Sequence, residues 1–409
     1  MKPIKPEQLA FLDWELGVFF HFGIRTFYEG HKDWDMQEMP LSGFNPTELD
    51  CEQWIRTARD GGAKYAILVC KHHDGFANWP SKYTAYSVAN TPWKDGKGDV
   101  VREFVDACRK YDLKVGLYYS PAEFGSSRKD AKEYDDYFIN QISELLTDYG
   151  KIDYLWFDGC GSEGHQYDTA RIVAEIRRLQ PGILLFNMWD PDTRWVGNEA
   201  GIAEYDNRNI VRLLDFSIQT ESRDYLSEDT FLPAECDCMI RQRNWFYSDQ
   251  DGHTLKTLEE LMGLYYCSVG RGANLLINIG PDRRGLLPEA DAARFVQFGQ
   301  KVGAMFAAPI ATMKDATREG NTYTFSFENP TLINHVVLEE VLEGGEHIEE
   351  FSIWIRPYHG RSIRMDGAPT VGHKRICRFP TVCTSQVEIV VEKENGAHTM
   401  KNISIYCAE

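Results

Sequence analysis

Up to about residue 310, apolar positions follow two alternating patterns. Short apolar runs of strand length are separated by longer stretches in which apolar residues recur at helical spacing. Regular alternation of strands and helices indicates a parallel sheet, and this many repeats predict a (β/α)8-like TIM barrel. The predicted strands are 17–22, 65–70, 114–119, 152–157, 183–188, 231–234 and 273–279. The predicted helices are 99–111, 169–179, 259–268 and 290–306.

The pattern changes after residue 310. The remaining apolar segments have period two and are separated by Gly, Asn and Pro turns, with no helical stretch between them. These segments are 322–327, 336–340, 351–355, 386–391 and 403–406. Several short strands without helices predict a small C-terminal antiparallel β-sandwich. We therefore expect two domains, a catalytic barrel over residues 1–310 and a sandwich over residues 311–409.

Charge narrows the range of partners. The 409 residues include 44 basic and 62 acidic side chains, for a net charge of −18. Such a field repels polyanions, so neither nucleic acid nor an anionic membrane is expected as a partner. No apolar run reaches the roughly 18 residues that a membrane helix needs. The sequence does not indicate an oligomeric state.

The N-terminal residues and the cysteines bear on the compartment. The first residues lack the apolar core of a secretory signal, so the chain as given is expected in the cytoplasm. Ten cysteines are scattered along the chain, several inside apolar patterns. The single close pair, Cys236 and Cys238, lacks the spacing of a tetrahedral zinc site. We expect reduced and mostly buried thiols.

Polar residues collect where the predicted barrel strands end. In a barrel these carboxyl ends meet at one mouth, where enzymes of this fold place their active sites. Polar side chains arriving from six separate strands are hard to explain by stability, so an active site is predicted there. The strand-end residues are His21, Lys71 to Asp74, Tyr118 and Tyr119, Asp158, Trp189 and Asp190, and Glu235 and Asp237.

Asp158 is the clearest single candidate for a catalytic residue. It ends the apolar run 152–157 beside Trp156 and Gly159, which predicts an oriented and poorly solvated carboxylate. A carboxylate nucleophile needs these conditions. The alternative is a structural strand-end Asp that caps the turn at Gly159.

Two glutamates compete for the role of general acid. Glu199 lies in a long Gly-containing connection, and a loop can bring such a group across the mouth toward Asp158. Without the context of the fold, the sequence favours an ordinary solvated loop residue at this position. Glu235 follows the apolar run 231–234 and is expected at a strand end.

The adjacent pair His72 and His73 has three interpretations. As metal ligands they would need a twisted backbone, because neighbouring strand residues point to opposite faces. They could instead bind the hydroxyl groups of a polar ligand, or form a satisfied structural pair. The metal interpretation corresponds to a metal-dependent barrel hydrolase with His21, His72, His73 and Asp158 as ligands.

Together these motifs resemble the α-L-fucosidases of glycoside hydrolase family 29. The resemblance runs from about residue 14 to residue 303, and several separate segments carry it in the same order. They are WELGVFFHFGIRTF (14–27), KYAILVCKHHDGF (64–76), DLKVGLYYSP (112–121), LWFDG (155–159), RWVGNEAG (194–201), LPAECD (232–237) and SVGRGANLLINIGP (268–281). The family has a barrel followed by a β-sandwich.

The resemblance implies an exo-acting retaining α-L-fucosidase that acts on fucosylated oligosaccharides or glycoconjugates without a metal or organic cofactor. Asp158 would be the nucleophile and Glu199 the acid/base, with Glu235 as the alternative because the acid/base varies among branches. Retention predicts two carboxyl groups about 5–5.5 Å apart. The WVGNE and PAECD segments resemble the branch that prefers α-1,3/1,4-linked fucose.

The resemblance also implies a set of sugar-binding residues. They are His21, Asp33, Trp34, His72, His73, Tyr119 and Trp195. Asp33 departs from the Glu that the family usually has at this position. Besides the metal-dependent hydrolase, one further alternative is a fucose-binding protein with a degenerate catalytic site.

Overall fold

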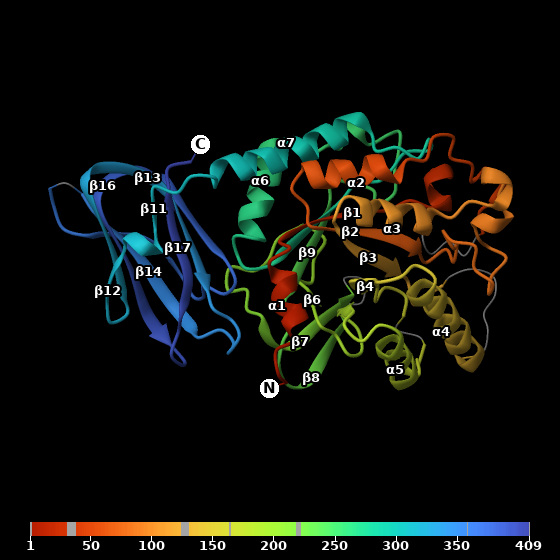
Figure 1. Cartoon of the computed structure of the whole chain (residues 1–409), viewed down its shortest axis with the longest axis horizontal. Coiled ribbons are helices and arrows are strands. Elements are labelled where there is room, and N and C mark those ends of the chain that lie inside the picture. Colours follow the sequence, from red (N-terminus) through yellow and green to blue (C-terminus); the bar gives the residue numbers. More distant parts are fainter. Residues whose placement is uncertain are drawn as a thin grey trace.

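Eight short apolar segments pair in parallel to form the barrel (Figure 1). The computed structural model describes residues 2–30, 38–123, 131–162, 165–217, 222–357 and 359–408. The barrel strands are β1 (Leu16–Phe20), β2 (Tyr65–Lys71), β3 (Lys114–Tyr119), β4 (Tyr154–Phe157), β5 (Leu184–Phe186), β6 (Arg194–Trp195), β9 (Ala234–Met239) and β10 (Asn274–Asn278). Their order is β5-β4-β3-β2-β1-β10-β9-β6, and a parallel bridge between Phe186 and Thr193 closes the ring.

Helices accompany most of the barrel strands. They are α1 (Pro6–Leu12), α2 (Cys51–Asp60), α3 (Val100–Lys110), α4 (Ala131–Thr147), α5 (Thr169–Leu179), α6 (Leu258–Cys267) and α7 (Glu289–Met305). In their described residues, two of the connections between barrel strands contain no helix. A short loop joins β5 to β6, and an antiparallel ribbon of β7 (Ile210–Ser217) and β8 (Ser222–Phe231) lies between β6 and β9.

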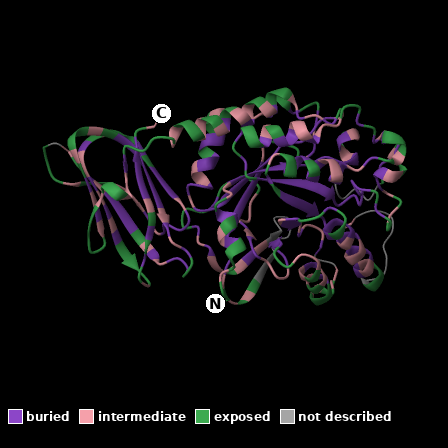
Figure 2. Ribbon diagram, viewed as in Figure 1, coloured by how far each residue is buried: buried purple, intermediate pink, exposed green. Residues whose placement is uncertain are grey.

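Helix α3 illustrates how local sequence sets these elements. The side chain of Asp99 accepts a hydrogen bond of 2.9 Å from the amide of Arg102, which caps the first turn. Val101, Phe104 and Cys108 are fully buried on one face of the helix. Figure 2 shows the same division in the barrel, with buried strands and helices exposed on their outer faces.

The predicted barrel is confirmed, with one strand misplaced and one missed. The run 231–234 does not form a strand of its own. Phe231 ends β8, whereas β9 begins at Ala234, and Pro233 separates the two because it lacks an amide hydrogen for strand pairing. Strand β6 has only two residues, too few to produce a recognisable period.

The C-terminal part is an antiparallel sheet of seven strands. They are β11 (Ala311–Thr312), β12 (Thr317–Glu319), β13 (Thr322–Glu340), β14 (Ile348–Arg356), β15 (Ile363–Ala368), β16 (Arg375–Glu394) and β17 (Met400–Tyr406). The two predicted strands 322–327 and 336–340 belong to the single strand β13, whose pairing with β16 shifts register between Ser326 and Thr331. The buried apolar side chains of these strands form a core that is separate from the core of the barrel.

The burial of most cysteines agrees with the expectation from the sequence. Six of the ten cysteines are buried. Among the described residues, no helix has both the length and the apolar character needed to cross a membrane.

Candidate active site

Asp158 stands at the carboxyl end of β4, at the mouth of the barrel. Its Oδ2 accepts a hydrogen bond of 2.8 Å from the hydroxyl of Tyr118, and its Oδ1 accepts one of 2.9 Å from the amide of Cys160. Nε2 of His73 lies 3.5 Å from Oδ2. The Asp158 side chain is nevertheless 26% exposed. It is thus an oriented carboxylate that a ligand can reach.

The surroundings of Asp158 keep it ionised. Burial alone would raise the pKa of its carboxyl group. The positive charge and hydrogen bonding of His73, with the amide of Cys160, outweigh burial and lower this pKa to about 2. An ionised carboxylate in a largely dry site can act as a nucleophile or stabilise a developing positive charge.

His72 and His73 both reach this mouth, which an ideal strand would not allow. The pairing of β2 with β3 shifts register between Val69 and Lys71, and a bulge of this kind re-aims the residues that follow it. The His72 ring stacks on Tyr118 at 5.5 Å, while His73 faces Asp158. One ligand atom from each of His72, His73 and Asp158 lies within 4.8 Å of the other two.

The hydrogen bonds of Ser120 assign the protons of His73. Oγ of Ser120 donates to the carbonyl of Ala122 at 2.6 Å, so it accepts at 2.5 Å from Nδ1 of His73. With Nδ1 protonated, Nε2 carries a proton only in the imidazolium form. That form places a positive charge beside Asp158.

His21 follows β1 and faces the mouth. The amide nitrogen of Asn278 donates to the carbonyl of Trp245 at 2.7 Å, so its Oδ1 points toward His21 and accepts from Nδ1 at 2.8 Å. In neutral His21 this leaves Nε2 as an acceptor. Such an acceptor suits a hydroxyl group.

The two tyrosines at the end of β3 point in opposite directions. Tyr118 belongs to the aromatic cluster inside the barrel and bonds Asp158. Tyr119 is fully buried between sheet and helices, where its hydroxyl donates to Oε1 of Gln141 at 2.7 Å. This placement corrects the expectation that Tyr119 faces the mouth. Strand alternation allows only one of two neighbours inside, and it is Tyr118.

Glu199 is exposed on the loop that follows β6. Gly197 and Gly201 flank it with positive φ values of 86° and 74°. Added Cβ atoms there would approach Asp215 and Cys238 to 2.7 and 2.9 Å, so glycine permits the close packing. A bridge between Ala200 and Cys238 pins the loop against β9.

Asp237 and Trp195 lie beneath this loop. Nε1 of Trp195 donates a hydrogen bond of 2.7 Å to Oδ1 of Asp237, and both side chains are buried. Burial raises the pKa of the Asp237 carboxyl well above its ordinary value, and the negative charge of nearby Glu199 raises it further. Trp195, predicted to bind sugar, therefore lies in the barrel core with its indole nitrogen committed to Asp237.

Glu235 is the second residue of β9, opposite Asn274 at the start of β10 and Trp195 of β6. It is fully buried and accepts hydrogen bonds from Tyr65 at 2.6 Å, Trp156 at 2.8 Å and Tyr154 at 3.3 Å. Burial raises the pKa of its carboxyl to about 7 despite these donors. The expectation that Glu235 stands at a strand end is corrected, because β9 runs on to Met239.

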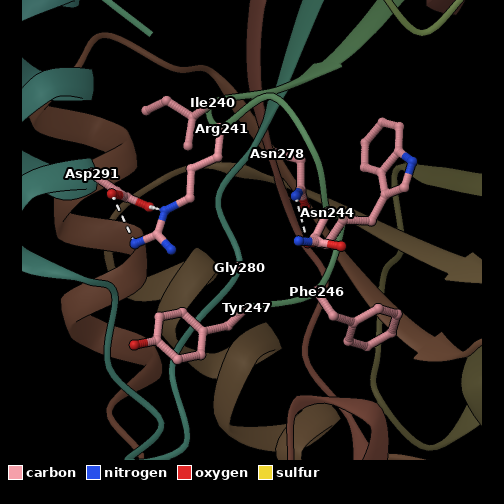
Figure 3. A pocket seen from close by; sticks show the side chains of 9 residues that line it. Ile240, Arg241, Asn244, Phe246, Tyr247, Asn278, Gly280 and Asp291 are labelled. Carbon is pink, nitrogen blue, oxygen red and sulfur yellow. Dashed lines mark hydrogen bonds and ion pairs between the residues drawn. The ribbon is translucent and has the colours of Figure 1, made fainter. Parts of the chain in front are cut away.

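A loop after β9 carries two aromatic residues that the pattern alone had not linked to the site. The His21 ring lies 4.9 Å from Trp245 and 5.4 Å from Phe246. On the other side of the loop, Arg241 reaches Asp291 of α7 (Figure 3). Of the missed residues, Asn278 had a signal as a polar residue near the end of the apolar run 273–279, whereas Phe246 had none.

The structure thus brings together His21, His72, His73 and Asp158 among the predicted site residues. It places Tyr119 between the sheet and the helices and Trp195 in the barrel core, and it buries Glu235 deep in the barrel. Asp33 and Trp34 lie outside the described residues. An ionised carboxylate ringed by imidazoles, a tyrosine hydroxyl and aromatic faces suits a polyhydroxylated ligand with a reactive carbon.

Comparison with known proteins agrees with this chemistry. Residues 4–304 match the protein-family model Alpha-L-fucosidase. The chain is 32% identical to Alpha-L-fucosidase 1 of Arabidopsis thaliana over 97% of its own length and 86% of that protein. The structure is similar to a glycoside hydrolase 29 family member from an unknown rumen bacterium, with a TM-score of 0.90, 33% identity and coverage of 100% and 78%.

A second similar structure holds a sugar. It is a Ruminococcus gnavus fucosidase of glycoside hydrolase family 29 in complex with fucose, with a TM-score of 0.88, 26% identity and coverage of 100% of this chain and 95% of that one. The family match, the plant relative and the shared barrel agree with one another. The chain belongs to the α-L-fucosidases of glycoside hydrolase family 29.

Proposed function

We propose that this α-L-fucosidase removes terminal α-linked L-fucose with retention of configuration, and that Asp158 is its nucleophile. The single observation that carries the proposal is the state of Asp158: ionised, oriented by Tyr118 and Cys160, and still open to a ligand. Its carboxylate attacks the anomeric carbon and forms a fucosyl-enzyme, which water then hydrolyses.

We propose Glu199 as the acid/base of both steps. Its exposed position on the loop beside the mouth lets it meet the departing glycosidic oxygen and afterwards the attacking water. Glu235 is less suited to this role. Three aromatic side chains already occupy its oxygens, and it has no exposed surface.

The sugar would be held by His21, His72, His73 and Tyr118, with Asp33 and Trp34 completing the set. Fucose presents hydroxyl groups together with an apolar methyl group. The imidazole nitrogens serve the hydroxyls, and Trp245 and Phe246 offer apolar ring faces beside His21. The fucose complex of the similar Ruminococcus gnavus enzyme supports fucose as the ligand.

The WVGNE and PAECD segments support a preference for α-1,3/1,4-linked fucose in oligosaccharides or glycoconjugates. This preference predicts higher kcat/KM on a Lewis-type trisaccharide than on an aryl α-L-fucoside. The ratio of the two rates is the measurement that tests the assignment. A ratio that favours the aryl fucoside contradicts it.

Variants of the two carboxylates test the mechanism. Asp158→Asn should lower kcat/KM at least about 10³-fold on every fucoside, because the nucleophile is lost. Asp168→Asn is a matched control, since Asp168 caps α5 and Asn caps equally well. Glu199→Ala should lower kcat/KM strongly for a poor leaving group and little for 2,4-dinitrophenolate, which leaves without a proton. Equal losses on both substrates would remove Glu199 from the mechanism.

A further inference from the structure

The segment that follows Glu199 gains much of its order from the C-terminal sheet. Between Ala200 and Asn209 the chain forms neither helix nor regular strand, so its backbone needs partners elsewhere. The barrel supplies some of them. The amide of Ala203 donates to the carbonyl of Cys267 at 2.9 Å, and Arg271 donates to the carbonyl of Ala203 at 2.6 Å.

The sheet holds the middle of this segment through Arg375. This residue opens β16 and is buried against the barrel. Its Nη2 donates a hydrogen bond of 2.7 Å to the carbonyl of Tyr205, and its guanidinium lies 5.0 Å from the centre of the Tyr205 ring. The Tyr205 hydroxyl in turn donates to the carbonyl of Gly367 at the end of β15.

Two further contacts hold the end of the segment. Nη2 of Arg208 donates to the carbonyl of Pro369 at 2.7 Å. Glu346, buried in the C-terminal part, accepts from both the amide and the side-chain nitrogen of Asn209, at 3.0 and 2.9 Å. Glu346 lies in the loop between β13 and β14, so a side chain of the C-terminal part bonds the backbone of the segment directly.

These contacts lie close to Glu199 along the chain. Tyr205 is six residues beyond Glu199, and the bridge of Ala200 to Cys238 fixes the near end of the same stretch. Glu199 therefore sits on a loop held by β9 at one end and by the C-terminal sheet at the other. Small errors in the position of a catalytic group carry large rate penalties.

We infer that the C-terminal sheet positions the acid/base loop, and that Arg375 is its central positioning residue. The inference rests on the proposed role of Glu199. It predicts that the sheet affects chiefly the step that needs proton donation. A sheet that merely stabilised the barrel would affect all substrates alike.

The test compares Arg375→Met with Arg378→Met in the full chain. Arg378 lies three residues further along β16 and also contacts the barrel, with its guanidinium 5.3 Å from the Tyr266 ring, but it does not touch the segment. Arg375→Met should lower kcat/KM about tenfold for fucosides with poor leaving groups and no more than about twofold for 2,4-dinitrophenyl fucoside. Arg378→Met should leave both values unchanged. Equal losses on the two substrates with Arg375→Met, or no loss, would overturn the inference.

Glu199→Ala in the same substrate series separates the two proposals. If it shows no dependence on leaving group, the role of Glu199 fails, whatever Arg375→Met does. If it shows this dependence and Arg375→Met does not, the positioning role fails alone. Hydrogen exchange gives a readout independent of activity: amides of residues 200–209 should exchange faster in Arg375→Met than in Arg378→Met, and equal exchange contradicts the inference.

A second variant covers poor folding of Arg375→Met. Arg208→Met removes the bond to Pro369 from a side chain that is 29% exposed, so it disturbs packing less. It should show the same selective loss on poor leaving groups, to a smaller extent. A uniform loss across the substrate series would overturn the inference in the same way.

Discussion

The hydroxyl of Tyr118 donates a hydrogen bond of 2.8 Å to Oδ2 of Asp158. The donor comes from β3 and the acceptor from the end of β4, so the pairing of two adjacent barrel strands fixes the bond. Tyr118 also stacks between His72 and Trp156, which restricts its ring. The packing of the barrel strands therefore fixes the orientation of the Asp158 carboxylate.

Tyr118→Phe tests this relationship. Loss of the donor removes a bond to the charged carboxylate, so the pKa of Asp158 should rise from about 2. Because the ionised form attacks, the acid limb of the kcat/KM profile should move to higher pH, and kcat/KM should fall about tenfold. The pH dependence of kcat/KM on an aryl fucoside measures both effects.

Tyr119→Phe is the matched control for that experiment. Its hydroxyl bonds Gln141 outside the barrel, so the acid limb should stay where it is in the unaltered enzyme. A shift of the limb in Tyr119→Phe, or its absence in Tyr118→Phe, contradicts the assignment.

Glu235 should make stability depend on pH. Its pKa is about 7 in the folded protein against an ordinary value of 4.5, so the folded state keeps a proton that the unfolded state has released. The stabilisation is complete below pH 4.5 and is lost as pH rises to 7, a fall of about 3 kcal/mol in the free energy of unfolding. Glu235→Gln cannot ionise, so its stability should lack this part of the fall in urea titrations at pH 4.5 and 7.

Glu235→Gln also tests whether Glu235, rather than Glu199, is the acid/base. With Glu199 in that role, Glu235→Gln should retain kcat/KM within a few-fold on a poor leaving group. Glu346, also with a pKa of about 7, contributes equally in both proteins and cancels in the comparison. Parallel pH dependences of stability, or a leaving-group-selective loss of activity, would speak against this assignment of Glu235.

Arg241 should be important for stability. It bonds Asp251 and Asp291, each at 2.7 Å, and the three side chains are 12%, 3% and 2% exposed. Arg241→Met leaves two buried carboxyl groups without their cation and should cost about 3–5 kcal/mol in the free energy of unfolding. It should also raise KM, since this loop carries Trp245 and Phe246.

Arg284→Met provides the comparison. Arg284 pairs with Asp282 from a side chain that is 55% exposed, and such a pair contributes at most about 1 kcal/mol. Urea unfolding of both variants measures the difference. Similar losses in the two variants would refute the structural role given to the Arg241 cluster.

Chelation tests the metal-dependent alternative. His72, His73 and Asp158 lie close enough to share an ion. However, both oxygens of Asp158 already accept hydrogen bonds, from Tyr118 and from the amide of Cys160. We expect kcat and KM to be unchanged after dialysis against EDTA. Loss of activity that added zinc restores would favour the metal-dependent hydrolase.

The sequence was sufficient for the barrel because most of its strands are continuous apolar runs with helices between them. It also placed Asp158 at the mouth of the barrel, because that position depends only on the end of one strand. It could not choose between Tyr118 and Tyr119, since that choice depends on which face of β3 turns inward. Nor could it place Glu235, because a two-residue break at Leu232 and Pro233 separates β8 from β9.

Contacts between segments far apart in the chain could not be predicted from the sequence. Phe246 reaches His21 through a loop whose course depends on Arg241, Asp251 and Asp291. The bonds of Arg375 to the segment after Glu199 join residues 170 positions apart. No local period encodes such contacts.

The most direct test of the central claim is the anomeric form of the first-released sugar. Proton NMR should follow a Lewis-type trisaccharide and an aryl α-L-fucoside during the first minutes of hydrolysis, before mutarotation mixes the anomers. Attack by Asp158 predicts α-fucose from both substrates, and no fucose with Asp158→Asn. Initial release of β-fucose, or undiminished release by Asp158→Asn, would contradict a retaining mechanism through Asp158.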